Sequence, residues 1–471
     1  MNATMWVGTT AAETARQEVY QYAPQRVLLV ALDMGKDVHV TMMRTLAEQL
    51  LLPPTKLPTL ATGYACFRGW LLGAVASGRY DLVLVGHEPT GVYHEAWQQQ
   101  LLVDLAPYRQ ADARPVVRYR LLNPTLVKRE RQRQTHRSRK SDALDVQAMT
   151  NLLAAGAGNE VTPFTPAVSQ LRHTLSQWRY LSKEQKRRTT QLLRTFDRLW
   201  PGALGDAQAY ARTHPDLPPL LHLVDSRPLQ RTTVRLLLEH CPDPHQLRQL
   251  GAAGIRQLFH DHGQRCGEQT AQRILTVAQQ SLLPPPSFTA WLGEQVQADF
   301  AHYRQAECDL LALQNQAEAL LPATPAQVLT TLPGVSPFFA ARYFAALGDH
   351  RRFTSAAHIW AFAGFDPSQH DSGNQHFTGG LSHRGAPFLR ATLFQLGFQA
   401  SLHSPDCAKA FARARQRGLT PTEAIIHVAN KVNRIFFALL TTQQPFCSAL
   451  SPTEFDFWSQ QMKKRRRPSA A

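Results

Sequence analysis

Four carboxylates stand at positions from which they could form one site. Asp33 ends an apolar run typical of a buried strand, and Glu88 follows a second such run. Asp142 and Asp145 are three residues apart near the start of a predicted helix, which places both on one helical face. The carboxyl ends of neighbouring strands in a parallel sheet converge on one crevice, so the four acids can meet although they are far apart in sequence.

Carboxylates gathered in this way repel one another unless cations neutralise them. Mg²⁺ (or Mn²⁺) prefers oxygen ligands and retains waters and substrate phosphates in its shell. Two such ions stabilise the attacking and leaving oxygens of a phosphodiester, which is the arrangement of ribonuclease-H-like nucleases. Each acid also has a structural alternative: Asp142 could cap its helix, and Asp145 could pair with a nearby arginine.

A strongly basic run lies directly before Asp142. Seven lysines and arginines stand there with one glutamate: Lys128, Arg129, Arg131, Arg133, Arg137, Arg139 and Lys140. We interpret the run as a loop that draws a nucleic-acid backbone toward the acids; the alternative is a solvated loop without a specific role. The basic tail at 463–467 is weaker evidence for the same partner.

Two turns in the last third of the chain carry further candidates. Gly334, in LPGVS, resembles the turn of a helix-hairpin-helix element, which points backbone N–H groups at a DNA phosphate; the alternative is a plain turn between packed helices. Ser372, in QHDSGN, has small and polar neighbours that favour an accessible hydroxyl, although local chemistry alone favours a turn residue. Arg384 and Arg390 could hold a phosphate bidentately, or could be surface arginines beside a solvated turn.

The bulk composition agrees with a nucleic-acid partner. The chain has 471 residues and a formal net charge of +16, and a chain this basic usually binds something anionic. Its six cysteines are widely spaced without a CxxC pair, which argues against a zinc ribbon or a disulfide framework. No apolar stretch is long enough for a membrane helix, and the N-terminus lacks the order of a signal peptide. We therefore expect a cytoplasmic protein with reduced cysteines.

Three regions differ in their predicted elements. Residues 1–160 alternate strands and helices, which predicts an α/β fold with a largely parallel sheet. Residues 161–321 have almost no strand signal, and helical periodicity over 168–199 and 300–321 predicts two long helices or a coiled coil that act as a spacer or dimerisation arm. Residues 322–445 read as a mainly α domain with the helix-hairpin-helix-like element, and 446–471 as a basic tail.

Several sequence blocks resemble one family, the insertion-sequence 110 family of transposases, also called DEDD transposases. In the first region the resemblance rests on ALDMGKDVHV, GHEPTGVYH, LLNPTLVK and RKSDALDVQA. In the third it rests on LPGVSPFFAARYFAALGD, RRFTSAAHIWAFAGFDPSQHDSGN and GGLSHRGAPFLRATL. The middle region resembles the family only in being helical.

The resemblance implies roles that composition and spacing do not supply. The family's four acids fall on Asp33, Glu88, Asp142 and Asp145, in a domain of the RuvC resolvase type, and its serine falls on Ser372. It implies that this serine attacks a DNA phosphodiester and forms a transient phosphoserine link, with Mg²⁺ held by the acids. It also implies an element-encoded non-coding guide RNA that pairs with donor and target DNA, and assembly as homodimers or homotetramers near the bacterial nucleoid.

Three hypotheses follow from these observations. The first is an RNA-guided recombinase that uses Ser372 together with the four acids. The second is a RuvC-like nuclease in which activated water cuts DNA and Ser372 is structural. The third is a basic DNA-binding protein without enzymatic activity, whose acids only cap and pair.

Overall fold

The computed structural model describes residues 9–89, 91–110, 112–135, 141–218, 221–224, 227–372, 375–381 and 385–466. The chain divides into two compact units. Unit 1 comprises residues 1–167, 328–335 and 346–471, and unit 2 comprises 168–327 and 336–345. None of the six cysteines forms a disulfide. Across the described residues, no helix is long and apolar enough to cross a membrane.

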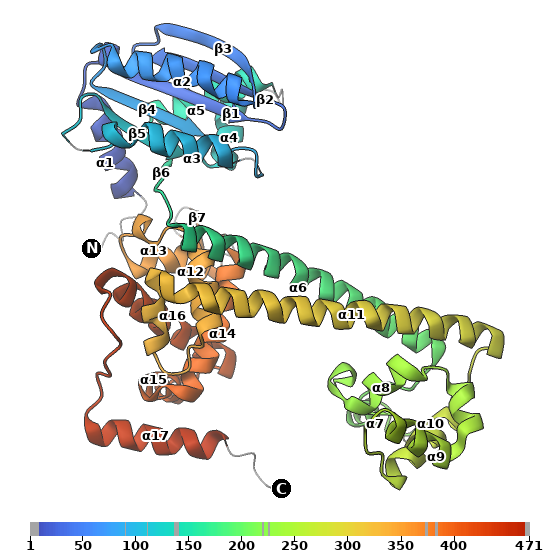
Figure 1. The fold of residues 1–471 in the computed structure, drawn as a ribbon. Helices are drawn as coiled ribbons and strands as arrows, with labels where there is room; N and C mark the ends of the chain where they lie inside the picture. The colour runs from blue at the N-terminus through green and yellow to red at the C-terminus, as the bar shows by residue number, and fades with distance from the viewer. Residues whose placement is uncertain are drawn as a thin grey trace. The chain divides into compact units, whose positions relative to one another are not determined.

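Unit 1 begins with a mixed α/β sheet domain (Figure 1). Its strands are β1 (Val27–Met34), β2 (Val38–Thr45), β3 (Leu50–Pro58), β4 (Leu82–His87), β5 (Val116–Leu121) and β6 (Asn159–Glu160). Its helices are α1 (Thr9–Tyr20), α2 (Ala61–Ala76), α3 (Glu95–Asp104), α4 (Pro124–Thr135) and α5 (Asp142–Ala154), with short 3-10 turns η1 (Pro24–Arg26) and η2 (Ala106–Tyr108).

The six strands form one sheet in the order β3-β2-β1-β4-β5-β6. The central strands β1, β4 and β5 are parallel, and β1 and β4 are buried on both faces, which explains their unbroken apolar sequences. The antiparallel return of β2 after the turn at Gly35 is the hairpin that the sequence predicts, whereas the antiparallel strands β3 and β6 were not predicted. β3 was missed because Pro53 and Pro54 weaken its strand signal, and prolines are tolerated there because β3 is an edge strand.

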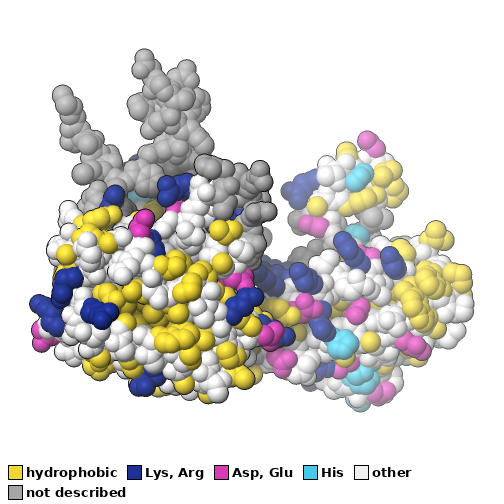
Figure 2. Space-filling model, turned by 90° about the horizontal axis from the view of Figure 1, so that it is seen from above, with side chains coloured by type: hydrophobic (Ala, Val, Ile, Leu, Met, Phe, Trp, Pro, Cys, Tyr) yellow, Lys and Arg dark blue, Asp and Glu magenta, His cyan; other side chains and the backbone are white. Residues whose placement is uncertain are grey.

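Helices cover both faces of the sheet. One core contains side chains of β1, β4 and β5 packed against α2 and α3. The other contains the alternate side chains of the same strands packed against α1, α4 and α5. The outer surface at α2 and β3 is partly apolar, because Leu51, Leu60 and Trp70 are exposed there. Figure 2, which views the molecule from above Figure 1, shows hydrophobic areas with lysines and arginines between and around them.

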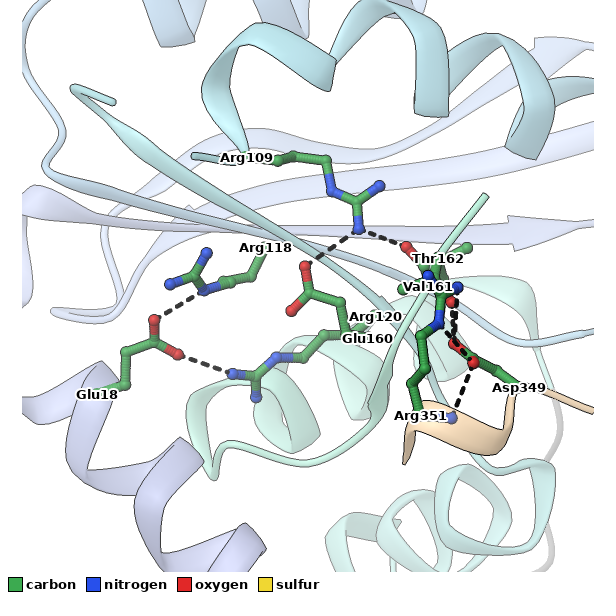
Figure 3. A network of polar contacts seen from close by, with 9 residues as sticks. All are labelled: Glu18, Arg109, Arg118, Arg120, Glu160, Val161, Thr162, Asp349 and Arg351. Atoms are coloured by element: carbon green, nitrogen blue, oxygen red, sulfur yellow. Dashed lines mark hydrogen bonds and ion pairs between the residues drawn. The ribbon is translucent and has the colours of Figure 1, made fainter. Parts of the chain in front are cut away.

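A polar network secures the outer edge of the sheet, where the chain leaves the domain (Figure 3). Glu18 of α1 accepts hydrogen bonds from Arg118 and Arg120 of β5. Arg120 is buried and also donates to the Gly156 carbonyl at 2.7 Å, and this burial lowers its pKa. Arg109 pairs with Glu160 of β6 at 3.2 Å. The network therefore fixes α1 to β5, and β6 to the segment that follows η2.

Unit 2 is helical, as predicted for the middle region. It contains α6 (Pro166–Leu199), α7 (Ala207–Thr213), η3 (Pro228–Gln230), α8 (Thr232–His240), α9 (Pro244–Asp261), α10 (Glu268–Gln280), α11 (Pro286–Leu320) and η4 (Leu321–Ala323). The long helices α6 and α11 run side by side in opposite directions (Figure 1). The smaller helices pack on the end where α6 stops and α11 begins, around buried Phe196, Trp200 and Phe300.

The C-terminal part of the chain is mainly helical, also as predicted. Its elements are η5 (Pro325–Thr331), α12 (Pro337–Leu347), η6 (His350–Arg352), α13 (Ala356–Phe362), β7 (Pro367–Ser372), β8 (Gln375–Leu381), α14 (Pro387–His403), α15 (Pro405–Gln416), α16 (Pro421–Thr442) and α17 (Pro452–Arg466). The antiparallel hairpin β7–β8 was not predicted, because its polar, glycine-rich sequence lacks the apolar alternation of a strand.

Candidate active site

Asp33 and Glu88 lie at the same edge of the sheet, on neighbouring parallel strands. Leu32 of β1 is in register with His87 of β4, so the next residue along each strand is one of the two acids. Both acids are half-buried. Side chains alternate along a strand, and Ala31 packs in the core that includes α5, so Asp33 belongs to the same face. Gly86 contacts Leu153 of α5, and the same alternation assigns Glu88 to that face.

Asp142 and Asp145 lie in the first turn of α5, the helix that covers this face. Ser141 is the N-cap residue, and its hydroxyl accepts from the Leu144 N–H, so the cap is the serine and not Asp142. Asp142 is exposed, whereas Asp145 is only 4% exposed. The four acids therefore come from three elements on one side of the sheet.

Arg131 of α4 holds the buried acid. Its guanidinium donates a hydrogen bond to the Asp145 carboxylate, and both side chains are largely buried. The alternative that Asp145 pairs with a nearby arginine is therefore realised in this structure. The pair supplies the positive charge that a buried carboxylate requires.

The donor chemistry of the four acids suits a hard divalent cation, because every candidate ligand is a carboxylate oxygen. Even so, in the part of the chain that the structure describes, no three His, Cys, Asp or Glu side chains are close enough together to hold a metal ion. The four acids thus share a face of the sheet without forming a complete metal site. Asp145, the most buried of them, is paired with Arg131.

The basic run before Asp142 is a helix up to Thr135, and the prediction of a loop there was wrong. Asn123 begins the helix, since its side chain accepts from the Thr125 N–H at 2.9 Å. The described basic residues of the run are Lys128, Arg129, Arg131 and Arg133; Arg137, Arg139 and Lys140 lie outside the described residues.

The helix α4 has two unlike faces. Its inner face carries Val127, Glu130 and Arg131, which face α5 and the sheet, at the spacing of one helical stripe. Glu130 accepts from Asn151 of α5 at 3.0 Å. Hydrogen bonds, foremost from Arg133, lower the pKa of Glu130 to about 2, so it remains charged. Lys128 is exposed on the outer face, as are Arg129 and Arg133, where a phosphate backbone could reach them.

Asn151 extends this contact to the sheet. It accepts a hydrogen bond at 2.8 Å from Arg44 of β2, a buried arginine that also donates to Thr150. No sequence motif signalled this role for Arg44, which stands in an ordinary strand. The chain of contacts from β2 through α5 to α4 fixes the helix that carries Arg131.

His87, next to Glu88, faces the opposite side of the sheet. Its ring is fully buried beside His94 and Tyr119, with ring centroids 5.3 Å apart in each case. Burial, with a smaller contribution from His94, lowers the pKa of His87 to about 3. His87 is therefore neutral at physiological pH and packs the strand end from which Glu88 follows.

Ser372 is the last residue of β7, and its partner in the register is Gln375 of β8. For this hairpin the structure describes the backbone, and Arg384 lies outside the described residues. The root of the hairpin is closely packed. Gly385 has φ +119° and lies so near the Phe362 carbonyl that a Cβ would stand 2.2 Å from that oxygen. The next N–H, of Ala386, donates to the same carbonyl at 2.9 Å.

Arg390 and Gly334 have structural contacts in unit 1. Arg390 donates to the Ala363 carbonyl at 3.1 Å, and so ties α14 to the end of α13 below the hairpin. Gly334 has φ +93°, and a Cβ there would stand 2.7 Å from the His403 Cβ of α14. The glycine is thus required by a tight turn packed on a helix; its contact with DNA remains a prediction.

Comparison with known proteins connects these features to a family. Residues 326–413, which include the Ser372 hairpin, match the transposase domain of the IS116/IS110/IS902 family. This segment of the chain therefore resembles the transposase domain of that family. Among its relatives, the 43.6 kDa protein of insertion element IS110 from Streptomyces coelicolor is 28% identical over 47% of this chain and 55% of that protein.

Two further relatives are described as a transposase and as a gene-inverting protein. A mini-circle protein of Streptomyces coelicolor, described as a transposase for IS117, is 26% identical over 69% of this chain and 76% of its own length. A pilin gene-inverting protein of Moraxella bovis is 30% identical over 41% of this chain and 57% of its own length. The chain thus spans little more than half the length of two of these three relatives.

Proposed function

We propose that the protein is a DNA transposase that cuts and rejoins strands through Ser372, assisted by Asp33, Glu88, Asp142 and Asp145. The observation that carries the proposal is the family match at residues 326–413, because it spans the hairpin whose first strand ends on Ser372. The relatives described as a transposase and a gene-inverting protein support rearrangement of DNA over simple cleavage. The sheet domain would then be of the RuvC-type ribonuclease-H-like class.

The proposed chemistry is two transesterifications. The Ser372 oxygen attacks a DNA phosphorus and forms a phosphoserine ester, while the displaced DNA hydroxyl leaves with a proton. A hydroxyl of a second DNA strand then attacks the same phosphorus, and the serine hydroxyl is regenerated. Bonds are exchanged without water or an external energy source. Mg²⁺ bound by the acids would neutralise phosphate charge and favour the ionised serine.

The chain's own residues supply the rest of the mechanism. Asp33 and Glu88, adjacent on parallel strands, would be the first metal ligands, and Asp145 would join them once Arg131 gives way. The exposed cations of α4 would hold the phosphate backbone beside the acids. We further propose, from the family resemblance, that an element-encoded RNA selects donor and target DNA and that the active form is a homo-oligomer.

A second candidate is a nuclease that activates water at the sheet domain. The adjacency of Asp33 and Glu88 favours it, because two carboxylates on one domain could bind a metal without any help from Ser372. The two functions predict different products, an adduct in one case and free ends in the other.

Covalent trapping tests the proposal. The full chain, the RNA from its element's flank, Mg²⁺ and end-labelled donor DNA are incubated and separated on a denaturing gel. We expect a protein–DNA adduct in the wild type and in Ser368→Ala, a control in the same strand, and none in Ser372→Ala. Equal cleavage without an adduct in all three proteins would establish the water-using nuclease instead.

A further inference from the structure

The long helix α6 of unit 2 concentrates positive charge. Its 34 residues include eight lysines and arginines and two acids, Glu184 and Asp197. The neighbouring helix α11 has the opposite balance, with one arginine and five acids in 35 residues. Solvated helices usually mix the two signs, so this segregation requires an explanation beyond solubility.

Six of the α6 cations form one line along the helix, which we call the α6 stripe. They are Arg172, Arg179, Lys183, Lys186, Arg187 and Arg194, all exposed. At about 100° per residue they fall within an arc of roughly 100°. The buried residues Leu192 and Phe196 lie away from this arc, against α11 and the small helices. The stripe is thus the outer face of this unit's helix pair.

Half of the stripe's charge is not cancelled within unit 2. Lys183, Lys186 and Arg194 have no ion-pair partner among the residues that the structure describes. Glu184 lies beside the stripe and pairs with Arg188 at 3.4 Å, and with Arg187 only at 4.0 Å.

Two charges of α11 pair with α8 rather than with these cations. Glu307 pairs with Arg235 of α8 at 2.7 Å, and Arg304 of α11 pairs with Glu239 of the same helix α8. Lys183, Lys186 and Arg194 therefore remain available to an external anion.

The dimensions of the stripe indicate the partner. From Arg172 to Arg194 the helix rises about 33 Å, close to the roughly 34–36 Å of one turn of B-form DNA. Regularly spaced cations on a straight rod suit a backbone with a phosphate every few ångströms better than a compact anion. We propose that the α6 stripe binds the phosphate backbone of duplex DNA, independently of sequence, in addition to the surface at α4.

This surface gives the middle region a role beyond that of a spacer. It requires neither the serine nor the acids, so it can hold DNA before any bond is broken. Since it contacts phosphates and no base edges, it adds affinity and positioning but no sequence preference. Its effect therefore appears in the salt dependence of binding, separately from the chemistry proposed above.

The test compares two triple variants of the full chain with equal loss of charge. Lys183→Gln, Lys186→Gln and Arg194→Gln remove half of the stripe. Arg212→Gln, Arg231→Gln and Arg265→Gln remove three exposed cations from other segments of unit 2. Binding of a 20-base-pair DNA duplex of arbitrary sequence is measured by fluorescence anisotropy between 50 and 200 mM salt, without divalent metal.

We expect the stripe variant to lower the slope of log K against log salt by about 2.7, at about 0.9 for each phosphate that the variant no longer neutralises. Over this range the affinity of the wild type then falls about fortyfold more than that of the variant. The control variant should follow the wild type. Equal slopes in all three proteins would overturn the proposal.

Two other results would also overturn it. If the stripe variant binds DNA normally but loses affinity for an RNA duplex of the same length, the surface serves RNA. If its DNA slope is unchanged but light scattering shows a smaller oligomer, the stripe contacts the acidic α11 of a second copy. An adduct in the trapping assay together with unchanged salt slopes would refute DNA binding by the α6 stripe but not the serine mechanism. The expected decrease in slope without any adduct would refute the serine mechanism but not DNA binding by the stripe.

Discussion

Replacing Arg131 tests whether this arginine is the counter-charge of the buried carboxylate Asp145. Arg131 and Asp145 have side chains only 12% and 6% exposed, so their ion pair is a buried one. Removing one partner of such a pair costs about 3–5 kcal/mol, because the remaining charge is left uncompensated. We therefore expect Arg131→Gln to lower the stability of the sheet domain by about 3 kcal/mol in the absence of divalent metal.

Divalent metal should reverse this loss. A cation that binds only the folded state at 100 times its Kd stabilises it by about 2.7 kcal/mol. In the wild type the arginine competes for Asp145, whereas in Arg131→Gln the carboxylate is left to the metal. We expect Mn²⁺ to bind the variant roughly tenfold more tightly, which corresponds to about 1.4 kcal/mol.

The assay is hydrogen exchange of α5, followed by mass spectrometry with and without Mn²⁺, and calorimetric titration of the metal. Arg129→Gln, an exposed neighbour, is the control and should change neither quantity. Arg131→Gln combined with Asp145→Asn should regain most of the lost protection and respond little to Mn²⁺. Equal protection and equal Mn²⁺ affinity in Arg131→Gln and wild type would refute the reasoning.

Three further predictions follow. Lys128→Gln with Arg129→Gln should lower the salt slope of DNA binding by about 1.8; an unchanged slope would mean that α4 does not contact phosphates. Gly334→Ala should destabilise the C-terminal part by about 1–3 kcal/mol in thermal unfolding, because φ is +93° and a Cβ meets His403; wild-type stability would show that the turn relaxes. The folded-state pKa of Glu130 lies near 2, below its ordinary value, so its contribution is present above about pH 5 and is lost as pH falls toward 2. Glu130→Gln should remove about 1–2 kcal/mol of the stability that the wild type loses in acid. This is less than the full pKa shift implies, because its partner Arg133 is 74% exposed. Acid unfolding is followed by circular dichroism, and identical curves for the variant and the wild type would contradict the prediction.

The sequence predicted the elements whose local signal is strong. The unbroken apolar runs of β1 and β4 identified buried parallel strands, and the heptad-like spacing of Leu171, Leu175 and Leu192 identified α6. The predicted helix with Asp142 and Asp145 near its start is α5. These features succeed because burial dictates the order of apolar residues directly: burial on both faces gives an unbroken run, and burial on one side gives the helical period.

Other features were set by partners distant in sequence. The strand β3 contains two prolines and exists because β2 offers it an edge to pair with. The hairpin β7–β8 lacks an apolar pattern and is rooted by Gly385 against Phe362. The basic run was predicted as a loop because its charges hide the inner stripe of Val127, Glu130 and Arg131 that packs on α5.

The sequence by itself determined which residues could do chemistry: the order of the four acids, the serine in its polar segment and the excess of positive charge. Only the tertiary structure decided their environments. It placed the acids on one face of a mixed sheet, gave Asp145 an arginine as its counter-charge, and separated the outer cations of α4 from the inner ones. The reason is physical, because charge and nucleophilicity belong to a side chain, whereas burial and pairing are created when distant segments pack.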